Sequence, residues 1–375
     1  MKQHVLLAAL AAGMSLLLAA CGGGSQEPLS HEQQYAERCA LADAQKDARR
    51  LPVPTGEHCL GRAHYALRDM QRLEPTGGDG PRHREVGVTV WYPATQWVGG
   101  AAAEYLAPEI AQILAANLEG LEAAVFDVRT YSRQEVPMAS GRHPVMLFSP
   151  GVGSLSALYT SLAEDMASHG YVVVAVDHPY VSGPVRLLDG SLAVNDEVDP
   201  ELLFTSSHVV VDDLRFVLDW LAVRNADTAH LLGGKLDLAH VGAYGHSYGG
   251  SAALQWARSD ARVLAGVNLD GSVFGDLSGS WDFPFLLLQA EHPPSEGPDP
   301  TIEAVWGARG SAAERMELAG MAHNSFTDTK YLLSQHKGVL TQELAAALDL
   351  GQGDAAAELS RVRQLTREFL GRYLR

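Results

Sequence analysis

The order of apolar and polar positions along this chain predicts most of its secondary structure. Two runs, 144–148 and 171–176, are apolar without interruption, which is typical of parallel strands buried on both faces. The segments 159–169 and 208–222 have helical character, and in the second the apolar residues recur three and four positions apart. Strands that alternate with helices in this way predict an α/β domain with a doubly wound, mostly parallel sheet.

The same reading extends to both sides of this region. The chain further predicts strands at 64–67, 86–92, 264–269 and 285–288 and a last helix at about 357–374. The strand at 86–92 alternates and stops at Pro93, which is typical of an antiparallel strand at a sheet edge. Residues 100–125 are rich in alanine and leucine, so a pair of inserted helices is expected within a helical insertion near 100–135. The whole domain is expected to span 61–375.

The first 20 residues have the features of an export signal. A short basic stretch, 1–4, precedes an apolar stretch, 5–18, that is too short to cross a bilayer as a stable helix. It ends in Leu18-Ala-Ala-Cys21-Gly22, which resembles the bacterial lipobox, where a lipoprotein precursor is cleaved before the cysteine that receives the lipid. The resemblance implies a signal peptide at 1–20, a lipid on Cys21, and a lipidated tether and N-terminal extension over 21–60. An ordinary signal peptide or an uncleaved anchor is the alternative.

The expected location follows from the same residues. No aspartate follows Cys21, so the resemblance implies a lipid-anchored protein of the bacterial cell envelope, held in the outer membrane and facing the periplasm or the surface. Two other cysteines remain, Cys39 and Cys59. In an oxidising compartment an isolated pair favours a disulfide over a metal site. Two unpaired thiols are the alternative.

Composition and charge narrow the class of partner. The chain has 375 residues, of which 46% are hydrophobic, enough for one large domain with its own core. Its formal net charge is −17, which argues against binding nucleic acid and against electrostatic docking on anionic lipid. A membrane partner is therefore expected only through the lipid on Cys21, and the oligomeric state stays open.

The strongest chemical signal is Gly245-His-Ser-Tyr-Gly249. A strand-like run, 238–244, precedes it and a helix-like run, 251–257, follows it. A strand, a tight G-x-S-x-G turn and a helix form a nucleophile elbow, which exposes the serine, here Ser247, at the top of the sheet. The N-terminus of the following helix also favours a developing negative charge. The alternative is a glycine-rich turn whose serine has no chemical role.

A serine hydroxyl is a weak nucleophile and needs a base that a carboxylate orients. In α/β-hydrolases the order along the chain is serine, acid, histidine, and three histidines follow the elbow: His292, His323 and His336. His323 lies in a loop just after an expected last strand at 315–318, where the base belongs. His292 comes directly after the strand at 285–288, too early for the base, and His336 falls in a polar helix.

The expected acid is Asp270. It comes directly after the strand at 264–269, at the end where functional side chains of open α/β sheets gather. An aspartate that only caps a turn is the structural alternative. The rival acids are Glu291, at the end of the next strand, and Glu296 and Asp299 beyond two prolines.

An oxyanion hole needs two backbone N–H groups. One is expected from Tyr248, directly after the nucleophile, and the other from Val152 in the glycine-containing loop 149–153, for which an ordinary strand-ending turn is the alternative. The histidines show no H-x-H or H-E-x-x-H spacing, and no phosphate- or dinucleotide-binding loop follows a strand. No metal and no cofactor are therefore expected.

From about residue 81 onward the chain resembles the secreted-type (isoform II) platelet-activating factor acetylhydrolases and their bacterial relatives. The resemblance rests on Val90-Trp-Tyr-Pro-Ala94, Phe148-Ser-Pro-Gly-Val-Gly153, Val173-Val-Ala-Val-Asp-His178, the elbow, Asn268-Leu-Asp270 and Met321-Ala-His-Asn324. It implies an α/β-hydrolase fold and calcium-independent hydrolysis of short or oxidised sn-2 acyl esters of phospholipids through an acyl-enzyme. Pro150 departs from the family, since many relatives have histidine there, and this bears on the shape of the acyl pocket. Residues 22–60 lie outside the resemblance.

Two other interpretations stay open. One is a general carboxylesterase, including polyester-hydrolase-like activity, because such enzymes share the elbow. The other is a surface lipoprotein that keeps the fold only to bind a partner. The insertion at 100–125 is a candidate wall of the acyl pocket, with plain core packing as the alternative for most of its leucines.

Overall fold

The computed structural model describes residues 29–39, 41, 49–75, 77, 80–95, 100–117, 121–195, 200–293 and 297–375. The expected signal peptide, the lipidation site Cys21 and residues 22–28 of the tether lie outside the described residues. Across the described ranges, none of the helices combines the length and the apolar character needed to cross a bilayer.

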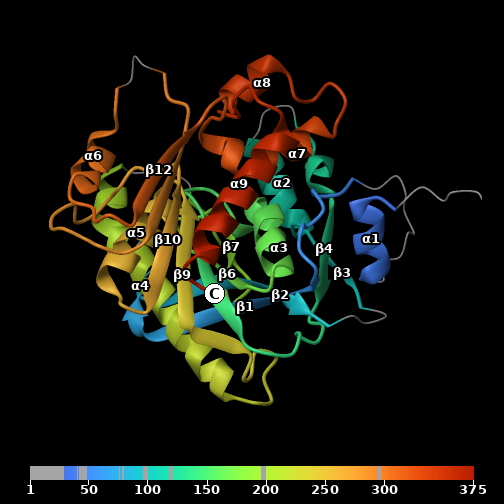
Figure 1. The fold of residues 1–375 in the computed structure, drawn as a ribbon, viewed down its shortest axis with the longest axis horizontal. Coiled ribbons are helices and arrows are strands. Elements are labelled where there is room, and N and C mark those ends of the chain that lie inside the picture. The colour runs from blue at the N-terminus through green and yellow to red at the C-terminus, as the bar shows by residue number, and fades with distance from the viewer. Residues whose placement is uncertain are drawn as a thin grey trace, which may run out of the picture.

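The strands and helices alternate as the sequence predicts (Figure 1). The strands are β1 (Cys59–Leu73), β2 (His83–Ala94), β3 (Ala102–Glu104), β4 (Arg129–Gln134), β5 (His143–Ser149), β6 (Val172–Asp177), β7 (Val185–Arg186), β8 (Leu192–Ala193), β9 (Leu236–His246), β10 (Val263–Leu269), β11 (Phe285–Ala290) and β12 (Ala313–Leu318). The helices are α1 (His31–Arg38), α2 (Pro108–Asn117), α3 (Thr160–Ser168), α4 (Pro200–Ala226), α5 (Tyr248–Ser259), α6 (Pro300–Trp306), α7 (Thr329–Ser334), α8 (Gln342–Ala347) and α9 (Ala355–Gly371), with 3-10 turns η1 (Ala123–Phe126), η2 (Ser156–Tyr159) and η3 (His323–Phe326).

One large sheet organises the domain. In the described part of the chain its order is β12-β11-β10-β9-β5-β6-β2-β1-β4-β3, and β7 and β8 pair separately. All neighbours from β12 to β6 are parallel, whereas β2 runs antiparallel to both β6 and β1. This arrangement confirms the expected α/β-hydrolase-type architecture.

Alternate side chains of the central strands enter two different cores, as a sheet covered on both faces requires. On β5, Val145 and Leu147 pack in a core with apolar residues of α4 and α5. Met146 and Phe148 point the other way, into a core with residues of α3 and α9. Figure 1 shows α9 lying beside α3, with α4 and α5 apart from this pair.

The strand β2 differs from its expected place at a sheet edge. It lies inside the sheet, between β6 and β1. The segment that pairs with β6 is Gly87–Trp91, so Pro93 lies beyond it and its missing N–H interrupts no bond to β6. A proline therefore does not confine this strand to a sheet edge, because it lies outside the segment that pairs with β6.

The insertion near 100–135 also differs from the expected helix pair. Its described residues form one α-helix, α2, and the short turn η1, between strands β3 and β4. The polar strand β4 pairs with β1, and its Tyr131 and Ser132 N–H groups donate to the buried Glu164 carboxylate of α3 at 2.9 and 2.8 Å. A side chain distant in sequence therefore supports this strand, and no local pattern reveals it.

The described part of the N-terminal extension packs on the domain. Tyr35 of α1 is fully buried, and its hydroxyl donates to the carbonyl of His58 at 2.9 Å. Cys39 and Cys59 form the expected disulfide, with 5.4 Å between their Cα atoms. Cys59 is the first residue of β1, so the domain boundary expected at residue 61 falls inside a strand. The disulfide links the N-terminal extension covalently to the sheet.

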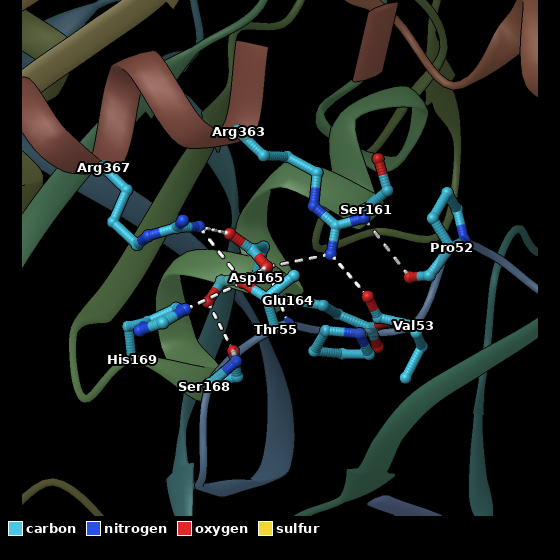
Figure 2. Close-up of polar contacts among 12 residues, drawn as sticks. Pro52, Val53, Thr55, Ser161, Glu164, Asp165, Ser168, His169, Arg363 and Arg367 are labelled. Carbon is cyan, nitrogen blue, oxygen red and sulfur yellow. Dashed lines mark hydrogen bonds and ion pairs between the residues drawn. The ribbon is translucent and has the colours of Figure 1, made fainter. Parts of the chain in front are cut away.

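A buried carboxylate also holds this segment. Asp165 of α3 has no exposed surface and accepts from the Thr55 N–H at 2.8 Å and from Arg363 at 2.9 Å. Arg367 pairs with its other oxygen. Figure 2 shows the two arginines reaching from α9 to Asp165, with Thr55 beside it and Arg363 also at the Val53 carbonyl. The contact joins three segments that are far apart in the chain.

We expect Asp165→Asn to lower the free energy of unfolding by about 3 kcal/mol, because it leaves Arg363, 5% exposed, buried without its counter-ion. Urea denaturation followed by circular dichroism measures the change. The matched control is Glu314→Gln, which breaks the solvent-exposed Glu314–Arg372 pair and should cost less than about 1 kcal/mol. Equal losses in the two variants would contradict the role given to Asp165.

Candidate active site

Ser247 stands at a strained turn between β9 and α5. Its backbone has φ +55° and ψ −124°, a conformation that costs energy for a residue with a side chain and clusters at functional sites. The turn is close-packed: a Cβ on Gly245 would lie 2.2 Å from the Gly249 carbonyl oxygen, and one on Gly249 2.0 Å from the Ser149 oxygen. Glycine is required at both positions, so the structure has the expected elbow geometry.

Asp270 and His323 meet beside this turn. Asp270 directly follows β10, also at a positive φ of +53°, and its Oδ2 lies 2.7 Å from His323 Nδ1. Burial alone would raise the pKa of Asp270, but the hydrogen bond and charge of His323 and the N–H of Ala290 outweigh it, so the pKa is lowered. An ionised carboxylate only accepts, so Nδ1 carries the proton and Nε2 is left with a lone pair for a hydroxyl proton.

The three side chains line one cavity of about 760 Å³. Its wall is completed by residues of strands β11 and β12, of the loops after β10 and β11 and of the N-terminal part of α6, namely Ser272, Phe274, Gln289, His292, Pro293, Gly297, Pro298, Asp299, Pro300, Ile302, Arg315, Glu317. Among the described residues, none from 100–135 lines it. The insertion instead lines a separate cavity of about 270 Å³, through Tyr105, Leu106 and Ile110, and is no wall of the cavity at Ser247.

The loop after β5 lies against the nucleophile. A Cβ on Gly151 would be 3.1 Å from the Cβ of Ser247. The next residue, Val152, donates its N–H to no other group in the described part of the chain, while Gly153 N–H is bonded to the Val181 carbonyl at 2.9 Å. Tyr248 is the first residue of α5, at the positive end of its dipole. Both expected oxyanion donors therefore belong to segments that adjoin Ser247.

The other two histidines differ from the base in their surroundings. His292 Nε2 lies 3.2 Å from Asp270 Oδ1, so it contacts the same carboxylate from the cavity wall, a contact the sequence did not predict. His336 follows α7 instead of lying in a helix, and it is half-buried. Of the rival acids, Glu291 accepts from the Gly320 N–H at 2.6 Å and Asp299 caps α6; Glu296 lies outside the described residues.

A second serine–histidine–aspartate set lies inside the domain. Ser149 Oγ is 3.0 Å from His178 Nε2, and His178 Nδ1 is 2.9 Å from Asp213 Oδ2. All three are at most 1% exposed, and Asp213 also binds Arg84. Burial excludes substrate from this set, so its effect is to hold Ser149, the first residue of the loop 149–153 that contains the expected donor Val152 (the oxyanion loop). The sequence gives no local signal for it, because its members lie in three separate segments.

The described residues hold no cluster of three or more histidine, cysteine, aspartate or glutamate side chains that could bind a metal ion. Ser247, His323 and Asp270 line one cavity, and this arrangement can activate a hydroxyl, orient an imidazole and bind an oxyanion.

We expect Asp270→Asn to leave the fold intact and to lower the turnover number for an ester by about 10⁴-fold, since the imidazole then adopts the wrong tautomer. Glu291→Gln, the matched control, should cost less than about tenfold. Steady-state hydrolysis of p-nitrophenyl acetate measures both, with circular dichroism to check folding. The reverse ranking would transfer the acid role to Glu291.

The chain is similar to known proteins over part of its length. Residues 81–187, from β2 to the turn after β7, match the family "Platelet-activating factor acetylhydrolase, isoform II". A protein of Arthroderma benhamiae named "Probable 1-alkyl-2-acetylglycerophosphocholine esterase" is 32% identical over 230 residues, 58% of this chain and 56% of its own length. A platelet-activating factor acetylhydrolase of Cavia porcellus is 22% identical over 274 residues, 66% of this chain and 61% of its own. The chain thus spans about three fifths of the length of these two relatives.

A solved structure extends the likeness to nearly the whole domain. The ferulic acid esterase from Streptomyces cinnamoneus superimposes with a TM-score of 0.73 at 27% identity, over 87% of this chain and 93% of its own. This fold shows that the chain belongs to the α/β-hydrolase superfamily, and over residues 81–187 the chain matches the isoform II platelet-activating factor acetylhydrolase family.

Proposed function

We propose that the protein is a serine carboxylic-ester hydrolase that works through an acyl-enzyme. The observation that carries the proposal is the 2.7 Å contact of His323 with Asp270 at the cavity that Ser247 also lines. Ser247 Oγ attacks the ester carbonyl while His323 Nε2 takes its proton, and Asp270 holds the imidazole and stabilises its cationic form. The N–H groups of Val152 and Tyr248 bind the oxyanion.

The second half of the cycle uses the same groups. The intermediate collapses when His323 gives its proton to the leaving alcohol, which leaves the acyl group on Ser247 Oγ. A water molecule, deprotonated by His323, then attacks the acyl carbonyl and releases the acid and the free serine. No step requires a metal or a cofactor from this chain.

The substrate we propose is a short or oxidised acyl ester at the sn-2 position of a phospholipid. The matching family supports this choice, and so do the names of two relatives, a probable 1-alkyl-2-acetylglycerophosphocholine esterase and a platelet-activating factor acetylhydrolase. The ferulic acid esterase with the same fold supports a second candidate, a general carboxylesterase. The Ser247–His323–Asp270 arrangement favours catalysis over a lipoprotein that only binds a partner, because binding alone does not require an activated serine.

We expect hydrolysis of p-nitrophenyl esters to be fastest for acetate and to fall steadily toward laurate. Ser247→Ala should lower the rate by at least about 10⁴-fold. A fluorophosphonate probe should label the wild type on the peptide that contains Ser247 and should leave the alanine variant unlabelled. Absence of labelling in the folded wild type would favour the binding interpretation. Hydrolysis that is fastest on long, unoxidised diacyl phospholipids would overturn the substrate assignment and leave the esterase chemistry intact.

We also propose that a lipid on Cys21 anchors the protein in the bacterial cell envelope, in the outer membrane. The lipobox-like residues 18–22 support this, and the Cys39–Cys59 disulfide supports an oxidising compartment. We expect Cys21→Ser to move the protein from the membrane fraction to the soluble fraction or to block its processing, as shown by fractionation and immunoblotting. Cys39→Ser, which leaves the lipobox intact, is the control. Unchanged membrane retention of the Cys21 variant would contradict the anchor.

A further inference from the structure

The elbow contains a histidine to which the mechanism gives no role. His246, directly before Ser247, is 2% exposed. Its ring packs against those of His323, at 4.6 Å between centroids, and Phe326, at 5.8 Å. Both nitrogens have partners: Nε2 is 2.8 Å from the His323 carbonyl oxygen, and Nδ1 is 2.8 Å from the Tyr159 hydroxyl.

The direction of these hydrogen bonds follows from the chemistry of their partners. A carbonyl oxygen only accepts, so the proton of His246 is on Nε2. Burial, with His323 next to it, lowers the pKa of His246 to about 3 against the opposing charge of Asp270, so the ring is neutral and Nδ1 accepts from Tyr159. Burial raises the pKa of Tyr159, with Asp328 and Asp177 acting in the same sense, so its hydroxyl keeps the proton it donates.

The Tyr159 oxygen lies 3.1 Å from Ser154 Oγ and can accept from it. Ser154 directly follows the oxyanion loop and is bonded to it, since its N–H donates to the Gly151 carbonyl at 3.1 Å. Gly151 is also near His246, since a Cβ there would lie 3.6 Å from Nδ1. One directed series of hydrogen bonds therefore runs from Ser154 through Tyr159 and His246 to the His323 backbone.

We propose that Tyr159 and His246 are positioning residues of the proposed esterase, which hold the base His323 in place relative to the nucleophile and the oxyanion loop. The proposal rests on the proposed function. The carbonyl that His246 binds is that of the base residue, and His246 itself is covalently joined to Ser247. Displacing a catalytic group by about 1 Å can cost 10²-fold in rate, so the series affects turnover more than substrate binding. Because the ring is neutral, it places no second cation beside the His323 imidazolium.

The experiment compares three variants by kcat, KM and thermal unfolding. Tyr159→Phe removes one oxygen and should lower kcat about tenfold, with KM unchanged within about twofold. His246→Phe keeps an aromatic ring but removes both hydrogen bonds, and should lower kcat about 100-fold. His246→Gln can place an N–H near the His323 carbonyl, so it should recover about tenfold of that loss. If His246 served only to fill the core, phenylalanine would be the better substitute and the ranking would reverse.

Tyr244→Phe is the matched control. Tyr244 packs against Phe148 at 4.8 Å between centroids, much as Tyr159 does at 4.7 Å. It takes no part in the series of hydrogen bonds. The kcat of Tyr244→Phe should therefore stay within about twofold of the wild-type value. Tyr159→Phe carries the test even if His246→Phe fails to fold. An active wild type with unchanged kcat in Tyr159→Phe overturns this inference alone, whereas a wild type that neither hydrolyses esters nor reacts with fluorophosphonate overturns the proposed function.

Discussion

The geometry of the site depends on the close approach of two backbones, at the point where β5 and β9 leave the sheet side by side. A side chain on Gly249 would meet the Ser149 carbonyl at 2.0 Å, and one on Gly151 would meet Ser247 at 3.1 Å. This contact sets the distance between the oxyanion loop and the nucleophile before any substrate arrives. Ser149 is in turn held by a hydrogen bond with His178, which Asp213 binds on its other ring nitrogen. The buried Ser149–His178–Asp213 set, which takes no part in the reaction, thus supports the loop beside Ser247.

Much of this fold could be predicted, because the central strands are buried on both faces and are therefore apolar without interruption. The elbow could be predicted from its glycines, and Asp270 and His323 from their places after strands β10 and β12. Strand β4 could not, because its Tyr131 and Ser132 are supported by Glu164 from a helix, and alanine-rich residues 102–104 form a strand despite their helical composition. The interior place of β2 could not be predicted either, since strand order is a property of the whole sheet.

The remaining site residues were beyond prediction for a different reason. His246 stands in the motif itself, yet its role depends on Tyr159 from another element and on the backbone of His323. His292 contacts Asp270 only because the loop after β11 turns back toward the cavity. Such contacts depend on how distant segments lie relative to one another in the fold. Residue type and spacing along the sequence do not predict this. The catalytic groups were easier to find than their supports because chemistry restricts residue identity more than packing does.

The contact of Asp165 with both ends of the domain bears on how the chain is made. Thr55 and Arg367 meet at the same carboxylate although 312 positions separate them. The carbonyl of Val53 accepts a hydrogen bond from Arg363. During synthesis, the segment near residue 55 can meet Asp165 of α3 but lacks the two arginines until the last helix has left the ribosome. Contacts so distant in sequence form late. The contact between the two ends of the domain is therefore completed last, when α9 brings Arg363 and Arg367 to a carboxylate that Thr55 can already reach.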